Sequence, residues 1–252
     1  MTPFAEPPAT QYDLRFSLLG VPVRIHPFFW LVGLLLGLRG DLTHVKIEEL
    51  LIWIAVLFVS ILIHEFGHAA AVIFYRDRPW IILYGFGGLC CHHPSRHDPW
   101  RQIVISFAGP AAGFLLLGFV LSAIRAAEHQ VGTVQLGLVP YPVFEPFESA
   151  NLNFLIVQLI WINFFWGLIN LLPIYPLDGG QIAREAFLLS DAGRGVERSL
   201  WLSVIAAAGV AVFGVVVLNE IFIALFFGYL AYNSWTILQR YRGFGGGFGG
   251  GF

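Results

Sequence analysis

The sequence has little charge, a single lysine and only two cysteines. Only 12% of its 252 residues are charged, whereas soluble domains carry about a quarter. Lys46 is isolated and no cluster of basic residues is present, which argues against nucleic acid as a partner. The cysteines, Cys90 and Cys91, are neighbours and cannot form an ordinary structural disulfide with each other.

Apolar residues are abundant instead. They make up 57% of the chain, with 24 Phe and 8 Trp, and the mean hydropathy is +0.74. One small core could not hide this surface, so we expect lipid to cover much of it. Five apolar runs are each long enough to cross about 30 Å of hydrocarbon: Leu50–Tyr75, Gln102–Ile124, Ser149–Leu177, Ser199–Asn219 and Ile221–Gln239. Ile25–Leu38 is a shorter sixth candidate, for which tilt or local bilayer thinning is expected.

These runs predict an all-α polytopic membrane protein with about six transmembrane helices. With both termini in the cytoplasm, eleven basic residues lie inside and three outside, which agrees with the positive-inside rule. Residues 16–24 indicate a short N-terminal strand, and the glycines within residues 80–91 indicate a membrane-associated hairpin after the second helix. The Gly/Phe-rich tail, residues 243–252, is expected to be disordered. No cleavable signal peptide is visible, so the spans themselves should direct targeting.

Two histidines and a carboxylate lie inside the second apolar run. His64, Glu65 and His68 are eight to twelve residues from Arg76, about 12–18 Å into the bilayer. A carboxylate at this depth costs at least about 2.5 kcal/mol, and a divalent cation would compensate it. Residues four apart share a helix face, so both imidazoles can aim at one ion while Glu65 reaches its water. In this HExxH pattern zinc lowers the pKa of the water and the glutamate takes the proton. Two core histidines bonded to neighbouring helices are the alternative.

A catalytic zinc ion needs a third protein ligand, and Asp178 is the best candidate. It ends the fourth apolar run, where Pro173 and Pro176 interrupt the helix. Broken backbone at membrane depth is tolerated mainly where protein or a wet cavity satisfies its polar groups. The alternative is that Asp178 merely caps the helix that begins at Gly179.

The sequence HEFGH at 64–68, together with Asn170-x-x-Pro173-x-x-x-Leu177-Asp178-Gly179, resembles the site-2 protease family of intramembrane zinc metalloproteases. The resemblance covers residues 16–190 and implies that His64, His68 and Asp178 bind one Zn²⁺ ion. It also implies that Glu65 is the general base and that Asn170 holds substrate or oxyanion.

Two further segments match the family in position. Residues 80–91, with Gly85, Phe86, Gly87 and Gly88, resemble its membrane-inserted hairpin, which is thought to pair with unfolded substrate; strand addition suits proteolysis of an extended peptide. Residues 109–113 resemble its small-residue motif in the third span, with Gly113 in place of the commoner Asn, and small residues there permit close helix packing.

These observations predict hydrolysis of a peptide bond in or near the transmembrane segment of another membrane protein, as in regulated intramembrane proteolysis. A metal-ion transporter with the same ligands and a membrane-anchored protease acting on soluble substrates are the alternatives. We expect one membrane-embedded protease domain over residues 1–252, a minimal form without an inserted peptide-binding or nucleotide-sensing domain, with its last two helices within residues 199–239. A bacterial inner membrane is the expected location. The cluster of Cys90, Cys91, His92, His93 and His97 matches no usual zinc spacing.

Overall fold

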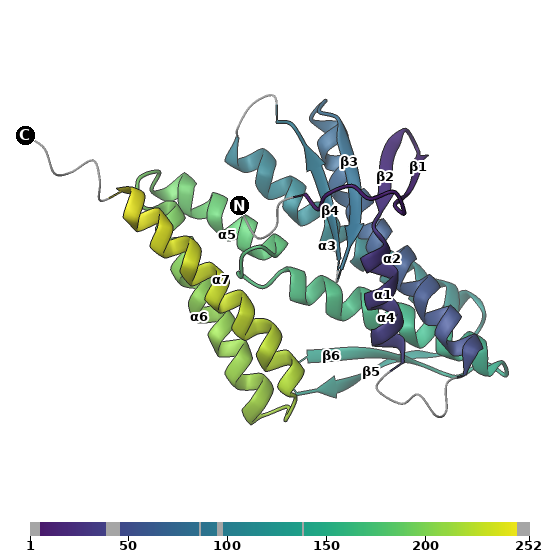
Figure 1. The fold of residues 1–252 in the computed structure, drawn as a ribbon. Helices are drawn as coiled ribbons and strands as arrows, with labels where there is room; N and C mark the ends of the chain where they lie inside the picture. Colours follow the sequence, from purple (N-terminus) through teal and green to yellow (C-terminus); the bar gives the residue numbers. More distant parts are fainter. Residues whose placement is uncertain (1–5, 39–45, 86, 95–97, 138, 246–252) are drawn as a thin grey trace, which may run out of the picture. The chain divides into compact units, whose positions relative to one another are not determined.

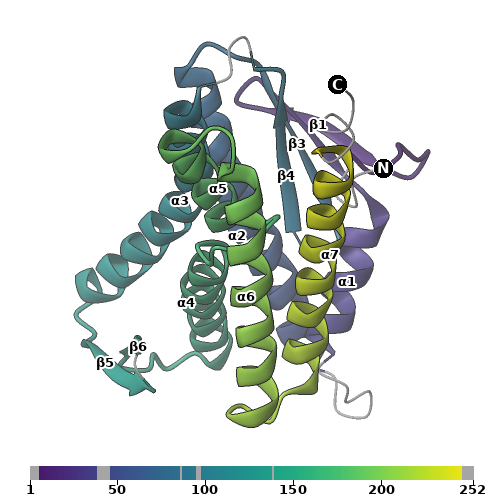
Figure 2. The same ribbon diagram turned by 90° about the vertical axis from the view of Figure 1, so that its left-hand side faces the viewer.

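The computed structural model describes residues 6–38, 46–85, 87–94, 98–137 and 139–245 (Figures 1 and 2). The chain divides into two compact units. The first, here called the sheet unit, comprises Glu6–Pro94 and Ala108–Leu168. The second, here called the C-terminal unit, comprises Ser95–Phe107 and Ile169–Phe252.

A four-stranded sheet lies in the sheet unit, with strand order β1-β2-β3-β4. The strands are β1 (Leu14–Leu18), β2 (Val21–Ile25), β3 (Pro79–Tyr84) and β4 (Gly87–His92). β1 pairs antiparallel with β2, β2 pairs parallel with β3, and β3 pairs antiparallel with β4. The predicted N-terminal strand is thus a hairpin of two strands, and the hairpin predicted within residues 80–91 is confirmed. Gly85 makes its turn with a positive φ of 54°, a conformation that glycine adopts without strain.

One face of the sheet packs against helix α2 and forms the main core of this unit. Val23 and Ile25 of β2 and Ile81 and Leu83 of β3 are each at most 2% exposed, and they cluster with Ile61 of α2. Side chains alternate between the two faces of a strand, so these alternate positions all point to the same side. The sheet is therefore anchored on the helix that carries the HExxH motif.

Seven helices are present among the described residues (Figure 1): α1 (Pro27–Gly37), α2 (Ile47–Phe74), α3 (Pro99–Ala126), α4 (Ala150–Asn170), α5 (Asp178–Ser190), α6 (Gly195–Val216) and α7 (Ile221–Gly245). Five of them, α2, α3, α4, α6 and α7, are long and apolar enough to cross a membrane. The five long spans expected from the sequence are thus found, and most of the chain outside the short strands is helical.

The sixth candidate span, Ile25–Leu38, contains a helix that is much shorter than the other five. α1 has 11 residues, about 16 Å of helix and half the thickness of the hydrocarbon core. It starts at Pro27 because Ile25 still belongs to β2, and the side chain of His26 caps it by accepting a hydrogen bond from the backbone of Phe28. The apolar run is therefore shared between a strand and a helix.

A second hairpin, which the sequence did not reveal, connects α3 to α4. Its strands β5 (Val131–Leu136) and β6 (Val139–Phe144) pair antiparallel. Tyr141 of β6 contacts Phe164 and Phe165 of α4 at ring-centroid distances of 5.5 and 5.6 Å. The hairpin is thus packed along α4 as part of the sheet unit.

In the C-terminal unit, α6 and α7 run side by side (Figures 1 and 2). Ala207 of α6 is buried with Phe227 and Leu230 of α7. At the other end of the pair, Arg242 donates to the carboxylate of Glu197. α7 continues to Gly245, so the first three residues of the tail expected to be disordered are helical, because extending an existing helix requires no new nucleation. Residues 246–252 lie outside the described residues.

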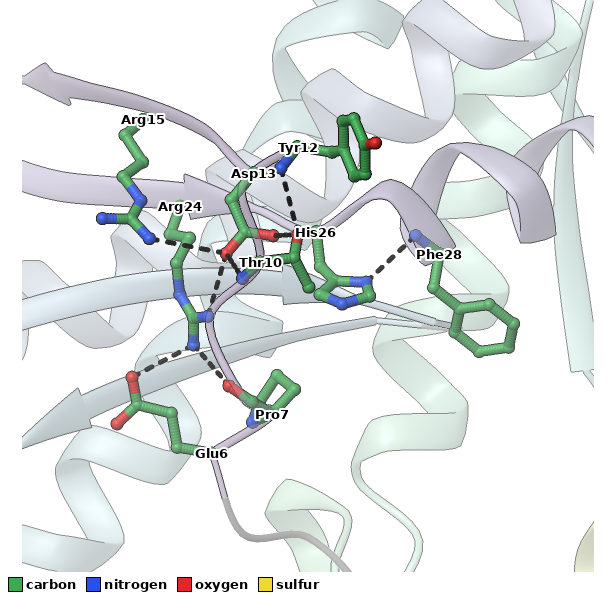
Figure 3. Close-up of polar contacts among 9 residues, drawn as sticks. All are labelled: Glu6, Pro7, Thr10, Tyr12, Asp13, Arg15, Arg24, His26 and Phe28. Carbon is green, nitrogen blue, oxygen red and sulfur yellow. Dashed lines mark hydrogen bonds and ion pairs between the residues drawn. The ribbon is translucent and has the colours of Figure 1, made fainter.

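The N-terminal segment is fastened to β2 through Arg24 (Figure 3). Its guanidinium donates to Asp13 Oδ2 at 3.1 Å, to Glu6 Oε1 at 3.1 Å and to the carbonyl of Pro7 at 2.8 Å. Asp13 also accepts from the Thr10 hydroxyl at 2.6 Å and from the Thr10 backbone at 3.0 Å. The hydrogen bond from the Thr10 side chain and, less strongly, the contact with Arg24 lower the pKa of Asp13 from 3.8 to about 2.

This network predicts how replacing Asp13 affects stability at different pH values. The pKa of Asp13 is lower in the folded protein, so its contribution is complete above its ordinary pKa and is lost as the pH falls toward 2. Asp13→Asn should therefore lower the melting temperature at pH 7, and the difference from the unmodified chain should shrink between pH 4 and pH 2. Tryptophan-fluorescence melts in detergent micelles measure both proteins. A difference of the same size at pH 7 and pH 2 would contradict the assignment.

Candidate metal centre

The histidines of α2 face a common point. Nε2 of His64 and Nε2 of His68 lie 3.2 Å apart, and one ligand atom from each of His64, Glu65 and His68 fits within 4.8 Å of the others. Two nitrogens bound to one tetrahedral zinc ion at about 2.0–2.1 Å would be about 3.3–3.4 Å apart. The imidazole pair therefore already has the spacing that a zinc ion requires.

All three side chains are buried, with exposed fractions of 4% for His64, 4% for Glu65 and 6% for His68. They lie in α2, an apolar helix of 28 residues. Buried charge needs a partner of opposite sign, and a cation held by the imidazoles would provide it for Glu65. The donor set thus fits a divalent cation in both spacing and chemistry.

Helix α3 approaches the imidazoles at a glycine. A Cβ atom built on Gly109 would overlap Nε2 of His68 and would lie 2.8 Å from Nε2 of His64. From the other side, a Cβ atom on Gly67 of α2 would overlap the carbonyl oxygen of Ala108. The two helices therefore touch through backbone at the level of the histidines. The sequence indicated close packing for residues 109–113 but did not show that Gly109 lies against the proposed ligands.

Strand β4 lies against the carboxylate of Glu65. A Cβ atom on Gly88 would overlap Cγ of Glu65 and would lie 2.5 Å from its Oε1. Gly87 lies near a large side chain, with its Cβ position 3.3 Å from Trp166 of α4. Of the predicted substrate-binding residues, the structure thus brings Gly88 to the HExxH helix and Gly87 to Trp166 of α4, and Gly85 lies in the adjoining turn. Phe86, also predicted to bind substrate, lies outside the described residues.

Asp178 and Asn170 belong to the C-terminal unit. Asn170 is the last residue of α4 and is 8% exposed, and Asp178 is the first residue of α5. The N-cap of α5 is Leu177, so Asp178 does not occupy the capping position that the alternative interpretation required. Its role as third ligand, like that of Asn170 toward substrate, remains a prediction from the sequence.

The cysteines and histidines of β4 form no second metal centre within the described part of the chain. The one described cluster that could hold an ion is His64, Glu65 and His68. Cys90 and Cys91 are consecutive in an extended strand, so their side chains point to opposite faces of the sheet. His97 lies outside the described residues.

Asn163 of α4 has a structural partner. Its amide donates to the Ser60 hydroxyl of α2 at 2.9 Å and to the carbonyl of Leu159 at 2.8 Å. Both Asn163 and Ser60 are buried. This hydrogen bond links α4 to α2 one turn before His64, so it helps to fix the position of α2 along its axis relative to α4.

Comparisons with known proteins identify the family of the chain. The sequence profile of peptidase family M50 matches residues 52–213. Stage IV sporulation protein FB of Bacillus subtilis is 31% identical over 162 residues, which are 64% of this chain and 46% of that protein. A zinc metalloprotease of Methanocaldococcus jannaschii is 27% identical over 178 residues, 69% of this chain and 45% of that protein. The chain thus spans about half the length of the curated relatives it matches.

Among solved structures, the site-2 protease from Methanocaldococcus jannaschii has the same fold, with a TM-score of 0.58. The match covers 90% of this chain and 95% of that one, at 21% sequence identity. Together with the apolar helices, these likenesses identify a multi-pass membrane protein.

The contact between Gly109 and the imidazoles predicts a metal-binding defect. Gly109→Ala should push the two rings apart and weaken zinc binding by about tenfold or more, the effect that disturbed ligand orientation usually has. Zinc per chain, measured by elemental analysis after dialysis against a chelator, is the readout.

Gly118→Ala is the matched control, because Gly118 lies on the same helix and a Cβ atom there meets nothing within 4 Å. The melting temperature of both variants shows whether they fold. Unchanged zinc retention in a folded Gly109→Ala protein would show that the ion does not lie between these rings.

Proposed function

The chain belongs to peptidase family M50, the site-2 protease family, and from this membership we propose that it is an intramembrane zinc metalloendopeptidase. Its substrates are other membrane proteins, cut in or near their transmembrane segments in regulated intramembrane proteolysis. The observation that carries the proposal is the buried pair of imidazole nitrogens, 3.2 Å apart and next to a carboxylate, in a helix long enough to span the bilayer. A soluble substrate would not enter the hydrocarbon and so would not reach a site at this depth.

In the proposed site, His64 and His68 from α2 and Asp178 from the start of α5 hold one Zn²⁺ ion. The ion supplies Lewis acidity, which polarises the scissile carbonyl and makes water a better nucleophile. Glu65 accepts a proton from the attacking water and then returns it to the leaving amine. Its position one residue after His64 leaves its carboxylate on the side of α2 that faces Gly88.

Substrate binding is assigned to β4 and its turn, with Gly85, Phe86, Gly87 and Gly88, and to Asn170. β4 is the last strand in the sheet order, and an extended peptide can add to such an edge through main-chain hydrogen bonds. A peptide bond in an intact helix is shielded by its own hydrogen bonds, so an unwound substrate is required. Strand addition supplies new partners for the unwound backbone at membrane depth.

The proposed setting is the inner membrane of a bacterium, with both termini in the cytoplasm. This orientation counts the short helix α1 as a sixth crossing with local bilayer thinning, and it then places eleven basic residues inside and three outside. Residues 1–252 then act as one protease domain with lipid around its spans. Water reaches the site from the cytoplasmic side, because His68 lies eight residues from Arg76.

The decisive variant is Glu65→Gln. The amide cannot accept the proton from water, so cleavage should fall by about a hundredfold or more, while the two histidines still bind zinc. The test co-expresses the chain with a panel of tagged single-span membrane proteins and compares the products formed with and without the substitution. Zinc content of the purified variant is measured alongside.

A product that appears with both forms would rule out Glu65 as the base. If the chain is a transporter, Glu65→Gln should leave part of the metal transport intact, since moving a metal ion requires no proton acceptor for hydrolysis. If no substrate in the panel is cut and the purified chain carries zinc across vesicle membranes, the chain is a transporter and the protease assignment is wrong.

A further inference from the structure

The loop that precedes Asp178 is packed into the C-terminal unit. Between α4 and α5 it turns through short backbone hydrogen bonds, from Ile174 to the carbonyl of Leu172 at 2.7 Å and from Leu177 to the carbonyl of Ile174 at 2.8 Å. Ile174 is fully buried and packs in one cluster with Ala207 of α6. The backbone that leads to Asp178 is therefore part of the core of this unit.

The first turn of α5 rests directly on this loop. A Cβ atom on Gly180 would lie 2.5 Å from the carbonyl carbon of Ile174 and 2.5 Å from the nitrogen of Tyr175. Gly179 is as close to the carbonyl of Leu171. A shift at Tyr175 thus cannot leave the start of α5 in place, so the position of Asp178 depends on the position of Tyr175.

Two serines from the last two spans hold the backbone of Tyr175. Its N–H donates to Oγ of Ser203 on α6 at 3.1 Å, and its carbonyl oxygen accepts from Oγ of Ser234 on α7 at 3.4 Å. Ser203 also donates to the carbonyl of Ser199 at 2.9 Å, which orients its lone pair toward the loop. Exposed fractions of 1% for Ser203 and 0% for Ser234 show that bulk solvent does not reach either hydroxyl.

We propose that Ser203 and Ser234 are positioning residues for Asp178, and that through them α6 and α7 set the geometry of the metal centre. The inference rests on the proposed function, since it takes Asp178 to be the third zinc ligand. Partners behind a metal ligand fix its orientation, and their loss usually weakens metal binding or activity by about 10- to 100-fold. Tyr175, which the serines bind, lies three residues before Asp178, so the serines act on the ligand through the backbone.

The two hydrogen bonds also make the position of Asp178 depend on how α6 packs against α7. One helix binds the N–H and the other binds the carbonyl of the same residue, so the bonds cannot both survive a sliding of α6 along α7. A change in the packing of this helix pair would thus also move Asp178. Ser203 should matter more than Ser234, because its bond to Tyr175 is shorter and its hydroxyl is held by a second bond.

The test measures zinc release from the purified full chain in detergent micelles after excess chelator is added. Ser203→Ala should release zinc about tenfold faster or more, and Ser234→Ala should show a smaller increase. Ser203→Thr keeps a hydroxyl and should restore much of the slow release. With a cleavable substrate, kcat should fall in Ser203→Ala while KM stays close to that of the unmodified chain.

Two matched controls separate positioning from general loosening. Ser199 and Thr236 lie on the same two helices, and their hydroxyls bond to carbonyls of their own helix, those of Val196 and Asn233. Ser199→Ala and Thr236→Ala should release zinc at the unmodified rate. The melting temperature of every variant is measured to show that it folds.

The outcomes distinguish a failure of this inference from a failure of the proposed function on which it rests. Asp178→Ala serves as the reference for a lost ligand. If it releases zinc rapidly while Ser203→Ala matches the unmodified chain, the positioning role is wrong and the ligand set stands. If Ser199→Ala and Thr236→Ala speed release as much as Ser203→Ala does, the effect is general and the inference also fails. If Asp178→Ala itself leaves release unchanged, the proposed ligand set is wrong.

Discussion

Two imidazoles and a carboxylate inside an apolar helix must be compensated by the protein, because lipid offers them no hydrogen bond. His64, Glu65 and His68 are all buried, and the nitrogens of the two rings lie 3.2 Å apart. A cation removes the cost of burying the carboxylate and uses the lone pairs of the rings at the same time. The rest of the sheet unit can be understood as the packing that keeps these three groups at one depth and orientation.

This packing depends mainly on glycines, which have no side chain. Gly67, Gly88 and Gly109 each occupy a position where a Cβ atom would overlap a neighbouring helix, the carboxylate or a ring. Small residues allow backbones to approach closely, and here the approach comes from α3 on one side and from β4 on another. The hydrogen bond from Asn163 to Ser60 adds a polar link in the same region. The site is thus a narrow space between backbones, which limits how far its three side chains can move.

Local periodicity explains which parts could be predicted from the sequence. The spacing of His64 and His68 is a property of one helix, and the apolar runs of the five long spans are equally local. The parallel pairing of Val23 with Ile81 could not be foreseen, because two helices separate the strands and nothing in either strand specifies its partner. β6 was missed because Pro140 and Pro142 lower its strand propensity, although an edge strand tolerates proline. The hydroxyls that hold Tyr175 were likewise hidden, since a serine in an apolar helix gives no sign of its partner.

The contact between Glu65 and Gly88 relates the proposed role of Glu65 to the backbone conformation that a bound substrate would have. A strand added to β4 would lie about 4.8 Å from it, so its backbone would run beside the strand that already touches the carboxylate. An intact helix could not add to β4 in this way, because its backbone N–H and C=O groups are already hydrogen-bonded within the helix. Glycine at 88 permits this proximity, and any side chain there would displace Glu65, the proposed general base. The edge position of β4 therefore supports the proposed preference for unwound transmembrane segments.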